Sequence, residues 1–442
     1  NNGSINSNRY APVHIGSGVK CNDFILCSGV DITDSTLVSC CFVGQGTVMG
    51  KHYSALDSLF FANCQGFHTV SHHKSSLLIA GMFSFLNAGS GSNQSNHMYK
   101  LGPIHQGMVE RGSKTTSDSY LLWPARIGAF TLVMGRHTKH SDTASLPFSY
   151  LIENATESYL VPAVNLRSVG TVRDAQKWPK RDNRKDPVRL DPINFNLLSP
   201  YTIQKMYTGI DVLRNIQSLA GANNEIYSYQ NCYIRASNLT KGIELYRIAI
   251  MKFMGNSVIS RIGRKPLSSV DELRKRLMPT TKAGSGEWVD LSGLIAPKTV
   301  IDDFIVKIKK NKFTADEIYY RFAYIHENYY DYEWTWAYKK MLDYLGKGID
   351  DVTVEDIIMI ITEWKAAVTT LDKMLYNDAR KEFNLNSKTG FGVDGDDVVK
   401  SMDFEKVRGS FEKNQFVQEC MNHIERKSAL AKETIDLLKN IK

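Results

Sequence analysis

A short repeated unit between residues 15 and 66 constrains the fold of this chain more than any other feature. The units read IGSGVK, CNDFIL, CSGVD, ITDSTL, VSCCF, VGQGTV, MGKHYS, ALDSLF and FANCQG, a spacing of six residues with occasional steps of five. An α-helix repeats about every 3.6 residues and cannot produce this period. Short strands joined by turns would place one residue of each unit on an inner face, which predicts a β-solenoid with a continuous core. The expected inward residues are Ile15, Cys21, Cys27, Ile32, Val38, Val43, Met49, Ala55 and Phe61.

The units IGSGVK and VGQGTV resemble those of the hexapeptide-repeat proteins. The resemblance implies a left-handed parallel β-helix with three units per coil and a homo-oligomer, a trimer in which solenoids pack side by side. The best-known members are acyltransferases that act on sugars, nucleotide sugars or amino acids. The whole chain, a degenerate solenoid followed by a large helical domain, is most similar to a little-characterised group of bacterial solenoid proteins.

Composition divides the chain into three parts and predicts an α+β, multidomain fold. Residues 1–172 are expected to form the solenoid, with a long inserted loop at about 87–120, where Gly, Ser, Asn, Thr and His dominate. Residues 173–196 are expected to be a basic linker or arm, since 173–189 holds seven basic and three acidic residues. Residues 197–442 are expected to be an all-α domain, because apolar residues recur there at spacings of three or four.

Charge and cysteine content narrow the classes of function. The net charge of +8 is modest for 442 residues and comes from local runs, so nucleic-acid binding is not expected. No run of about 18 apolar residues occurs, so no membrane span is expected. Five of the seven Cys lie in or beside the repeats as small core residues, which favours a reducing, cytoplasmic location.

Histidine is concentrated in the solenoid half of the chain. Nine of the eleven precede residue 141: His14, His52, His68, His72, His73, His97, His105, His137 and His140. Most of the side chains that titrate near neutral pH therefore lie in this half. Each one taken alone is more simply a surface or hydrogen-bonded structural residue.

Acyl transfer from a thioester requires a general base for the acceptor hydroxyl or amine and donors for the oxyanion. The resemblance implies that the base is a His on a coil and that the donor is acyl-coenzyme A. His137 and His140, in VMGRHTKHSD, are the candidates, and Asp142 could orient one of them. Arg136 and Lys139 could bind a phosphate or carboxylate. The alternative for this segment is a solvated turn of mixed charge.

A second set of candidate substrate-binding residues lies in the expected loop: His97, Lys100, His105, Arg111 and Lys114. Cations and hydroxyls together suit a phosphorylated or nucleotide-linked sugar. A polar loop that satisfies its own backbone explains the same residues. We expect no dedicated metal site, because no ligand motif occurs, although convergence of His97, His105, His137 and His140 with Asp142 is the alternative.

Two other functions stay open at this point, so enzymatic activity itself is uncertain. In sugar-phosphate nucleotidyltransferases such a solenoid is an appended domain, which requires a nucleotide-binding domain before residue 1. The other alternative is a non-catalytic carbohydrate-binding or assembly protein whose helical half docks a partner.

Overall fold

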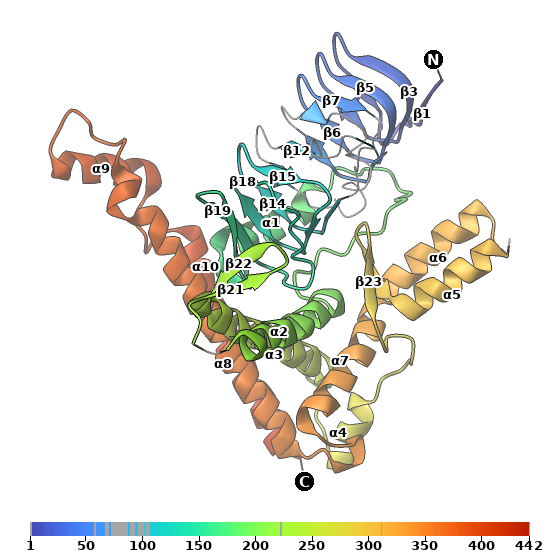
Figure 1. Cartoon of the computed structure of the whole chain (residues 1–442). Helices are drawn as coiled ribbons and strands as arrows, with labels where there is room; N and C mark the ends of the chain where they lie inside the picture. Colours follow the sequence, from blue (N-terminus) through green and yellow to red (C-terminus); the bar gives the residue numbers. More distant parts are fainter. Residues whose placement is uncertain are drawn as a thin grey trace. The chain divides into compact units, whose positions relative to one another are not determined.

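The computed structural model describes residues 2–441 except 57–58, 67–69, 72–86, 89–92, 96–100, 102–106, 222 and 311. The chain forms two compact units. The first comprises residues 1–165, 174–246 and 280–336, and the second comprises residues 166–173, 247–279 and 337–442. Figure 1 traces the chain from the first strands in blue to the last helices in red.

The first unit begins with a parallel β-solenoid (Figure 1). One wall contains β1 (Gly3–Ile5), β3 (Lys20–Leu26), β5 (Leu37–Val43), β7 (Ser54–Leu56) and β10 (Val70–Ser71), with β8 (Leu59–Phe60) also paired to β5. A second wall contains β2 (His14–Ile15), β4 (Asp31–Ile32), β6 (Val48–Met49) and β9 (Gln65–Gly66). Every pair in these two walls is parallel.

The length of a coil agrees with the repeat in the sequence. Lys20 lies beside Leu37, and Leu37 lies beside Ser54, so successive coils are equally long. Two units of six and one of five fill each of these intervals. The register therefore confirms the predicted solenoid and its period.

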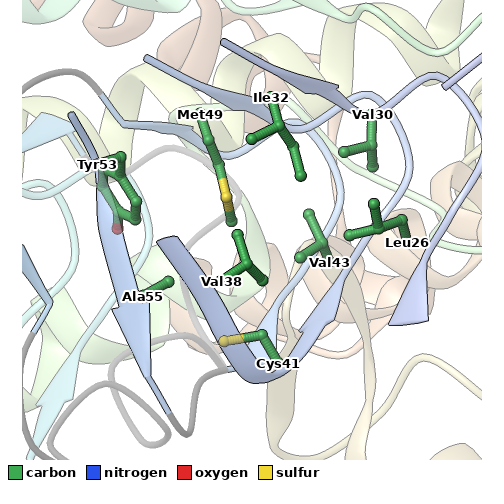
Figure 2. Close-up of a cluster of buried hydrophobic side chains, with 9 residues drawn as sticks. All are labelled: Leu26, Val30, Ile32, Val38, Cys41, Val43, Met49, Tyr53 and Ala55. Atoms are coloured by element: carbon green, nitrogen blue, oxygen red, sulfur yellow. The ribbon is translucent and has the colours of Figure 1, made fainter. Parts of the chain in front are cut away.

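The interior of the solenoid is built from the expected positions. Figure 2 shows its core side chains: Leu26, Val30, Ile32, Val38, Cys41, Val43, Met49, Tyr53 and Ala55. Six of the nine residues expected to point inward are buried: Cys27, Ile32, Val38, Val43, Met49 and Ala55. Ile15 is instead 46% exposed, because its strand β2 lies at the end of its sheet and pairs only with β4. Cys21 and Phe61 are half-buried.

The corners of successive coils use residues in the left-handed backbone region. Gly29, Gly46 and Asn63 occupy equivalent corners of consecutive coils, with φ of 72°, 68° and 58°. Gly and Asn adopt this conformation at the lowest steric cost. Ser35 and His52 occupy another corner, with φ of 60° and 58°. His52 is therefore a turn residue of the solenoid.

The solenoid continues through β19, and it includes short strands within residues 87–120, where a long inserted loop was expected. Three further walls are formed by β11 (Asn87–Ala88), β14 (Lys114–Thr115), β17 (Leu132–Met134) and β19 (Tyr150–Asn154); by β12 (Asn93–Ser95), β15 (Tyr120–Leu122) and β18 (Arg136–His137); and by β13 (Met108–Val109) and β16 (Arg126–Ile127).

The strands within residues 87–120 have parallel partners, so the loop prediction is wrong for them. Asn87 pairs with Lys114, and Lys114 pairs with Leu132, so the first of these two coils is much longer than the second. Polar residues misled the prediction here, because Glu110, Arg111 and Ser113 are buried.

An extension of the sheet with both antiparallel and parallel pairs ends the solenoid. β19 pairs with β20 (Glu157–Val161), and the same sheet continues through β22 (Cys232–Arg235) to β21 (Ile226–Tyr229). A 3₁₀ turn at Val164–Arg167 and helix α1 (Val169–Lys177) follow β20 in the chain.

The expected basic arm lies along the solenoid. After a 3₁₀ turn at Pro179–Arg181, the backbone of Val188 and Leu190 exchanges hydrogen bonds with the Gln45 side chain, at 2.9 and 2.8 Å. Asn63 donates to Asp182 at 2.9 Å. These contacts hold the arm against the coils, even though its charge alone suggested a solvated linker.

The rest of the first unit is mainly helical, as expected. It contains α2 (Pro200–Ala220), the first part of α3 (Ala236–Ile262), α5 (Lys298–Lys309), α6 (Ala315–Glu327) and the first part of α7 (Tyr329–Leu345). Two antiparallel hairpins interrupt the helices: β21 with β22, and β23 (Trp288–Leu291) with β24 (Leu294–Pro297). The all-α prediction missed them. Gln230 and Asn231 form the first turn with positive φ, as two-residue hairpins require.

The second unit is a helical assembly around α8 (Val354–Ala379) and α10 (Gln415–Lys439). It also contains residues 166–173, the remainders of α3 and α7, α4 (Val270–Leu277), α9 (Asp397–Arg408) and 3₁₀ turns at Ile349–Asp351, Arg380–Phe383 and Leu385–Lys388. Trp364 is fully buried, and its indole Nε1 donates to Asn256 at 3.0 Å. Among the residues described above, no helix is long and apolar enough to cross a membrane.

Candidate functional site

His137 lies inside the solenoid. It is the last residue of β18 and is fully buried. Its Nδ1 lies 2.8 Å from the hydroxyl of Ser158 on β20. Burial lowers the pKa of His137 to about 4 and outweighs nearby backbone groups and Glu153, which raise this pKa. The ring is therefore neutral at pH 7 and has no solvent-accessible surface from which to contact a substrate.

The state of His137 predicts a pH dependence of stability. Since its folded-state pKa lies below 6.5, the unfolded chain takes up a proton first as the pH falls. Wild type should lose about 2 kcal/mol of unfolding free energy from this residue between pH 7 and 5. His137→Gln lacks this loss, so the stability gap between wild type and variant should narrow at pH 5. Urea unfolding at pH 7 and pH 5 measures this difference in unfolding free energy, and His14→Gln, at an exposed histidine, is the control. A difference that is the same at both pH values would contradict the low pKa assigned to His137.

His140 occupies a more accessible position, just after β18. It is half-buried, and its Nδ1 lies 3.0 Å from the backbone carbonyl oxygen of Pro124. A carbonyl oxygen only accepts, so Nδ1 carries the hydrogen. In the neutral ring the lone pair is then on Nε2, the tautomer that can accept a proton there. The His140 carbonyl in turn accepts from Asn231 Nδ2 at 2.8 Å.

Asp142 pairs with a backbone amide and with an arginine. Its Oδ1 accepts from the backbone N–H of Ala144 at 3.0 Å, and its Oδ2 lies 3.7 Å from Nη1 of Arg126. The carbonyl of Pro124, rather than Asp142, holds Nδ1 of His140.

Arg136 and Lys139 lie on the surface and already have carboxylate partners. Arg136 Nη1 is 3.4 Å from Asp118 Oδ1, and its guanidinium is 5.3 Å from the ring centre of Tyr120. Lys139 forms an ion pair with Glu157, and this hydrogen bond raises the pKa of the Lys139 ammonium. Such exposed pairs contribute little stability.

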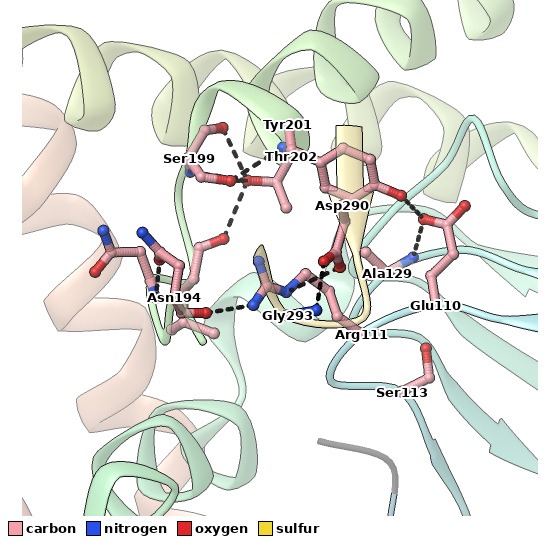
Figure 3. Close-up of polar contacts among 12 residues, drawn as sticks. Glu110, Arg111, Ser113, Ala129, Asn194, Ser199, Tyr201, Thr202, Asp290 and Gly293 are labelled. Atoms are coloured by element: carbon pink, nitrogen blue, oxygen red, sulfur yellow. Dashed lines mark hydrogen bonds and ion pairs between the residues drawn. The ribbon is translucent and has the colours of Figure 1, made fainter. Parts of the chain in front are cut away.

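Arg111, by contrast, belongs to a buried polar network, shown in Figure 3. Its side chain has no exposed surface, its Nε is 3.5 Å from Oδ2 of Asp290, and Nη2 donates to the carbonyl of Asn194. Oδ1 of Asp290 accepts from the N–H of Gly293 at 2.8 Å. Arg111 thereby connects a solenoid coil to the β23–β24 hairpin.

Glu110 forms the other half of this network. It accepts hydrogen bonds from the hydroxyl of Tyr201 and from Nζ of Lys205, both at 2.8 Å, and from the N–H of Ala129 at 3.2 Å. Burial, followed by the Glu110 and Asp290 charges, raises the pKa of Tyr201 far above its ordinary value. Tyr201, Lys205 and Asp290 were not predicted from the sequence, because nothing local indicates their pairing with Glu110 and Arg111.

The remaining candidates do not gather around His140. Lys114 is largely buried and ion-paired with Asp174, which lies beyond the solenoid in the sequence. His97, Lys100 and His105 lie outside the described residues. Substrate binding by Arg111, Lys114 and these three residues therefore stays a prediction. Among the residues that the structure describes, no group of three or more His, Cys, Asp and Glu side chains is placed to hold a metal ion.

Comparison with known families gives two matches. Residues 1–217 are similar to a domain of unknown function (DUF4954), and residues 269–438 are similar to a second domain of unknown function (DUF6819). No curated protein matches the chain. The two matches are consistent with a solenoid part and a helical part, and neither carries an activity.

Proposed function

We propose that this chain is an acyltransferase that moves an acyl group from a thioester donor, such as acyl-coenzyme A, to a sugar or nucleotide sugar. His140 is the general base of this reaction. The observation that carries the proposal is the contact between Nδ1 of His140 and the Pro124 carbonyl, which selects the neutral tautomer whose Nε2 is the proton-accepting atom.

The reaction balances without a further reagent. The acceptor oxygen attacks the thioester carbonyl while Nε2 of His140 takes the hydroxyl proton. The tetrahedral intermediate then expels the coenzyme A thiolate, which receives that proton and leaves as the thiol. His137, sealed in the interior, has a structural role in this proposal, and Asp142 positions the turn through Ala144 and Arg126.

Arg136 and Lys139 support an anionic substrate in the proposal. Their side chains are 54% and 42% exposed and flank the buried His137 along the chain. Phosphate groups of a nucleotide sugar or of coenzyme A can replace Asp118 and Glu157 as their partners. We also propose the cytoplasm as the location, since all seven cysteines are free thiols, and a side-by-side homo-oligomer, a trimer, as the assembly.

A second candidate is carbohydrate binding without chemistry. The burial of His137 and the existing ion pairs of Arg136 and Lys139 favour a function without chemistry, because each of these side chains has a structural partner.

A thermal-shift screen tests whether the proposed ligands bind. A ligand that binds only the folded chain raises the melting temperature by mass action. We expect stabilisation by an acyl-coenzyme A and by a sugar or nucleotide sugar, with a smaller shift in Arg136→Gln/Lys139→Gln. Arg214→Gln/Lys241→Gln, two charges on helices α2 and α3, is the matched control. No shift with either ligand class at millimolar concentration would contradict acyl transfer, and a shift with sugars alone would favour binding without chemistry.

A further inference from the structure

The extended solenoid sheet has an apolar and aromatic outer face. Along β17, β19, β20 and β22, alternate residues are buried, and the residues between them point outward. Strand register places four outward residues side by side in one row: Met134, Ile152, Tyr159 and Tyr233. A second row holds Leu132, Tyr150 and Val161. All seven are half-buried, so solvent reaches this face.

Two tyrosine rings lie side by side on this face, and each has a cation near its ring. The ring centres of Tyr159 and Tyr233 lie 5.6 Å apart, with planes tilted by 43°. The guanidinium of Arg235 is 5.7 Å from the ring centre of Tyr159, and Nζ of Lys139 is 5.8 Å from that of Tyr233. The order across the surface is Arg235, Tyr159, Tyr233, Lys139, which continues along the chain to His140.

The cations at the two ends differ in their pairing. Lys139 is bound to Glu157. Arg235 is exposed, and across the described part of the chain no ion pair includes it. A ligand on this face thus meets two tyrosine rings and one guanidinium that has no carboxylate partner there.

We propose that this face binds an extended acidic sugar chain. The apolar faces of the sugar rings would lie on Tyr159 and Tyr233, and a carboxylate, sulfate or phosphate of the chain would bind Arg235. Neighbouring strands are about 4.8 Å apart, so the row of outward residues presents a flat surface to consecutive rings rather than a pocket for one. The sugar chain can also be the acyl acceptor, and this second role rests on the proposed function. Binding of the sugar chain to this face does not depend on that function.

The charges of the face favour a sugar chain over a single-stranded nucleic acid. A nucleic acid carries one phosphate per nucleotide and requires a groove of cations along its backbone. Here Glu157 offsets Lys139, and Asp118 offsets Arg136. Sparse positive charge beside aromatic rings fits a ligand whose negative charges are also sparse.

Isothermal titration calorimetry with three probes tests the proposal: hexagalacturonate, neutral cellohexaose and a twelve-nucleotide oligo-dT. We expect hexagalacturonate to bind wild type more tightly than either other probe. Tyr233→Ala and Arg235→Gln should each weaken that binding at least tenfold, whereas Tyr233→Phe should retain it. Tyr320→Ala, at a 68% exposed tyrosine on α6, and Arg214→Gln on α2 are controls expected to bind like wild type.

Three results would overturn this binding face. They are absence of hexagalacturonate binding at millimolar concentration, tighter binding of oligo-dT, or unchanged affinity in folded Tyr233→Ala and Arg235→Gln. The two proposals can fail separately. Binding with this mutational pattern but without acyl transfer rejects only the reaction, and acyl transfer to a sugar that is insensitive to Tyr233→Ala rejects only the face.

Discussion

Asp290→Ala is expected to lower the free energy of unfolding by roughly 3–5 kcal/mol, because it leaves the guanidinium of Arg111 buried without its carboxylate. Both side chains of this ion pair are fully buried, and the Nε–Oδ2 distance is 3.5 Å. The variant also removes the acceptor for the N–H of Gly293. Urea unfolding followed by circular dichroism measures the loss.

Two further variants test whether the loss of stability comes from the unpaired guanidinium of Arg111 or from the loss of any carboxylate. Asp302→Ala removes a carboxylate from an exposed ion pair with Lys298 and should cost less than about 1 kcal/mol. The double variant Arg111→Met/Asp290→Leu removes both charges and should be more stable than Asp290→Ala. If Asp290→Ala costs no more than Asp302→Ala, the buried pair does not have the structural role assigned to it.

His140→Asn is expected to reduce the rate of acyl transfer by about 10²–10⁴, the usual contribution of a positioned general base. Asn has a similar size and can still donate to the Pro124 carbonyl, but it cannot accept the acceptor proton. The rate of thiol release from acetyl-coenzyme A in the presence of the acceptor measures the effect.

His52→Asn is the matched control for this loss. His52 lies at a solenoid corner with φ of 58°, a conformation that Asn adopts readily, so the variant should fold and react like wild type. Equal rates in His140→Asn, His52→Asn and wild type would exclude His140 as the base.

The solenoid was predictable because its determinants are local in sequence. Each regular coil contains two units of six and one of five, so the period, the inward positions and the parallel pairing all follow from neighbouring units. The failure at Ile15 has a simple cause, since a residue at the end of a stack lacks a neighbour on one side. The helical region was predictable for the same reason, from spacings of three and four residues.

The buried network was not predictable, because its partners are distant in sequence. Arg111 on a solenoid coil pairs with Asp290 on a much later hairpin, and Glu110 pairs with Tyr201 and Lys205 on α2. Charged residues in a Gly- and Ser-rich segment indicated an exposed loop, whereas the fold supplies each with a partner.

At the candidate site, the sequence pointed to both His137 and His140. The two residues share one segment and the same surrounding charges, so no local pattern distinguishes them. Only the fold separates them, by sealing His137 inside the solenoid and leaving His140 at a half-buried turn.

Acyl transfer is tested most directly by the mass of the acceptor after incubation with wild-type protein and acetyl-coenzyme A. Sugars and nucleotide sugars that stabilise the protein in the thermal-shift screen serve as acceptors, and reactions without protein correct for spontaneous transfer. We expect an acceptor that carries one acetyl group, formed together with an equal amount of free coenzyme A thiol. If ligands bind but no acetylated acceptor accumulates above the protein-free reaction, the chain is a binding protein and His140 is not a catalytic base.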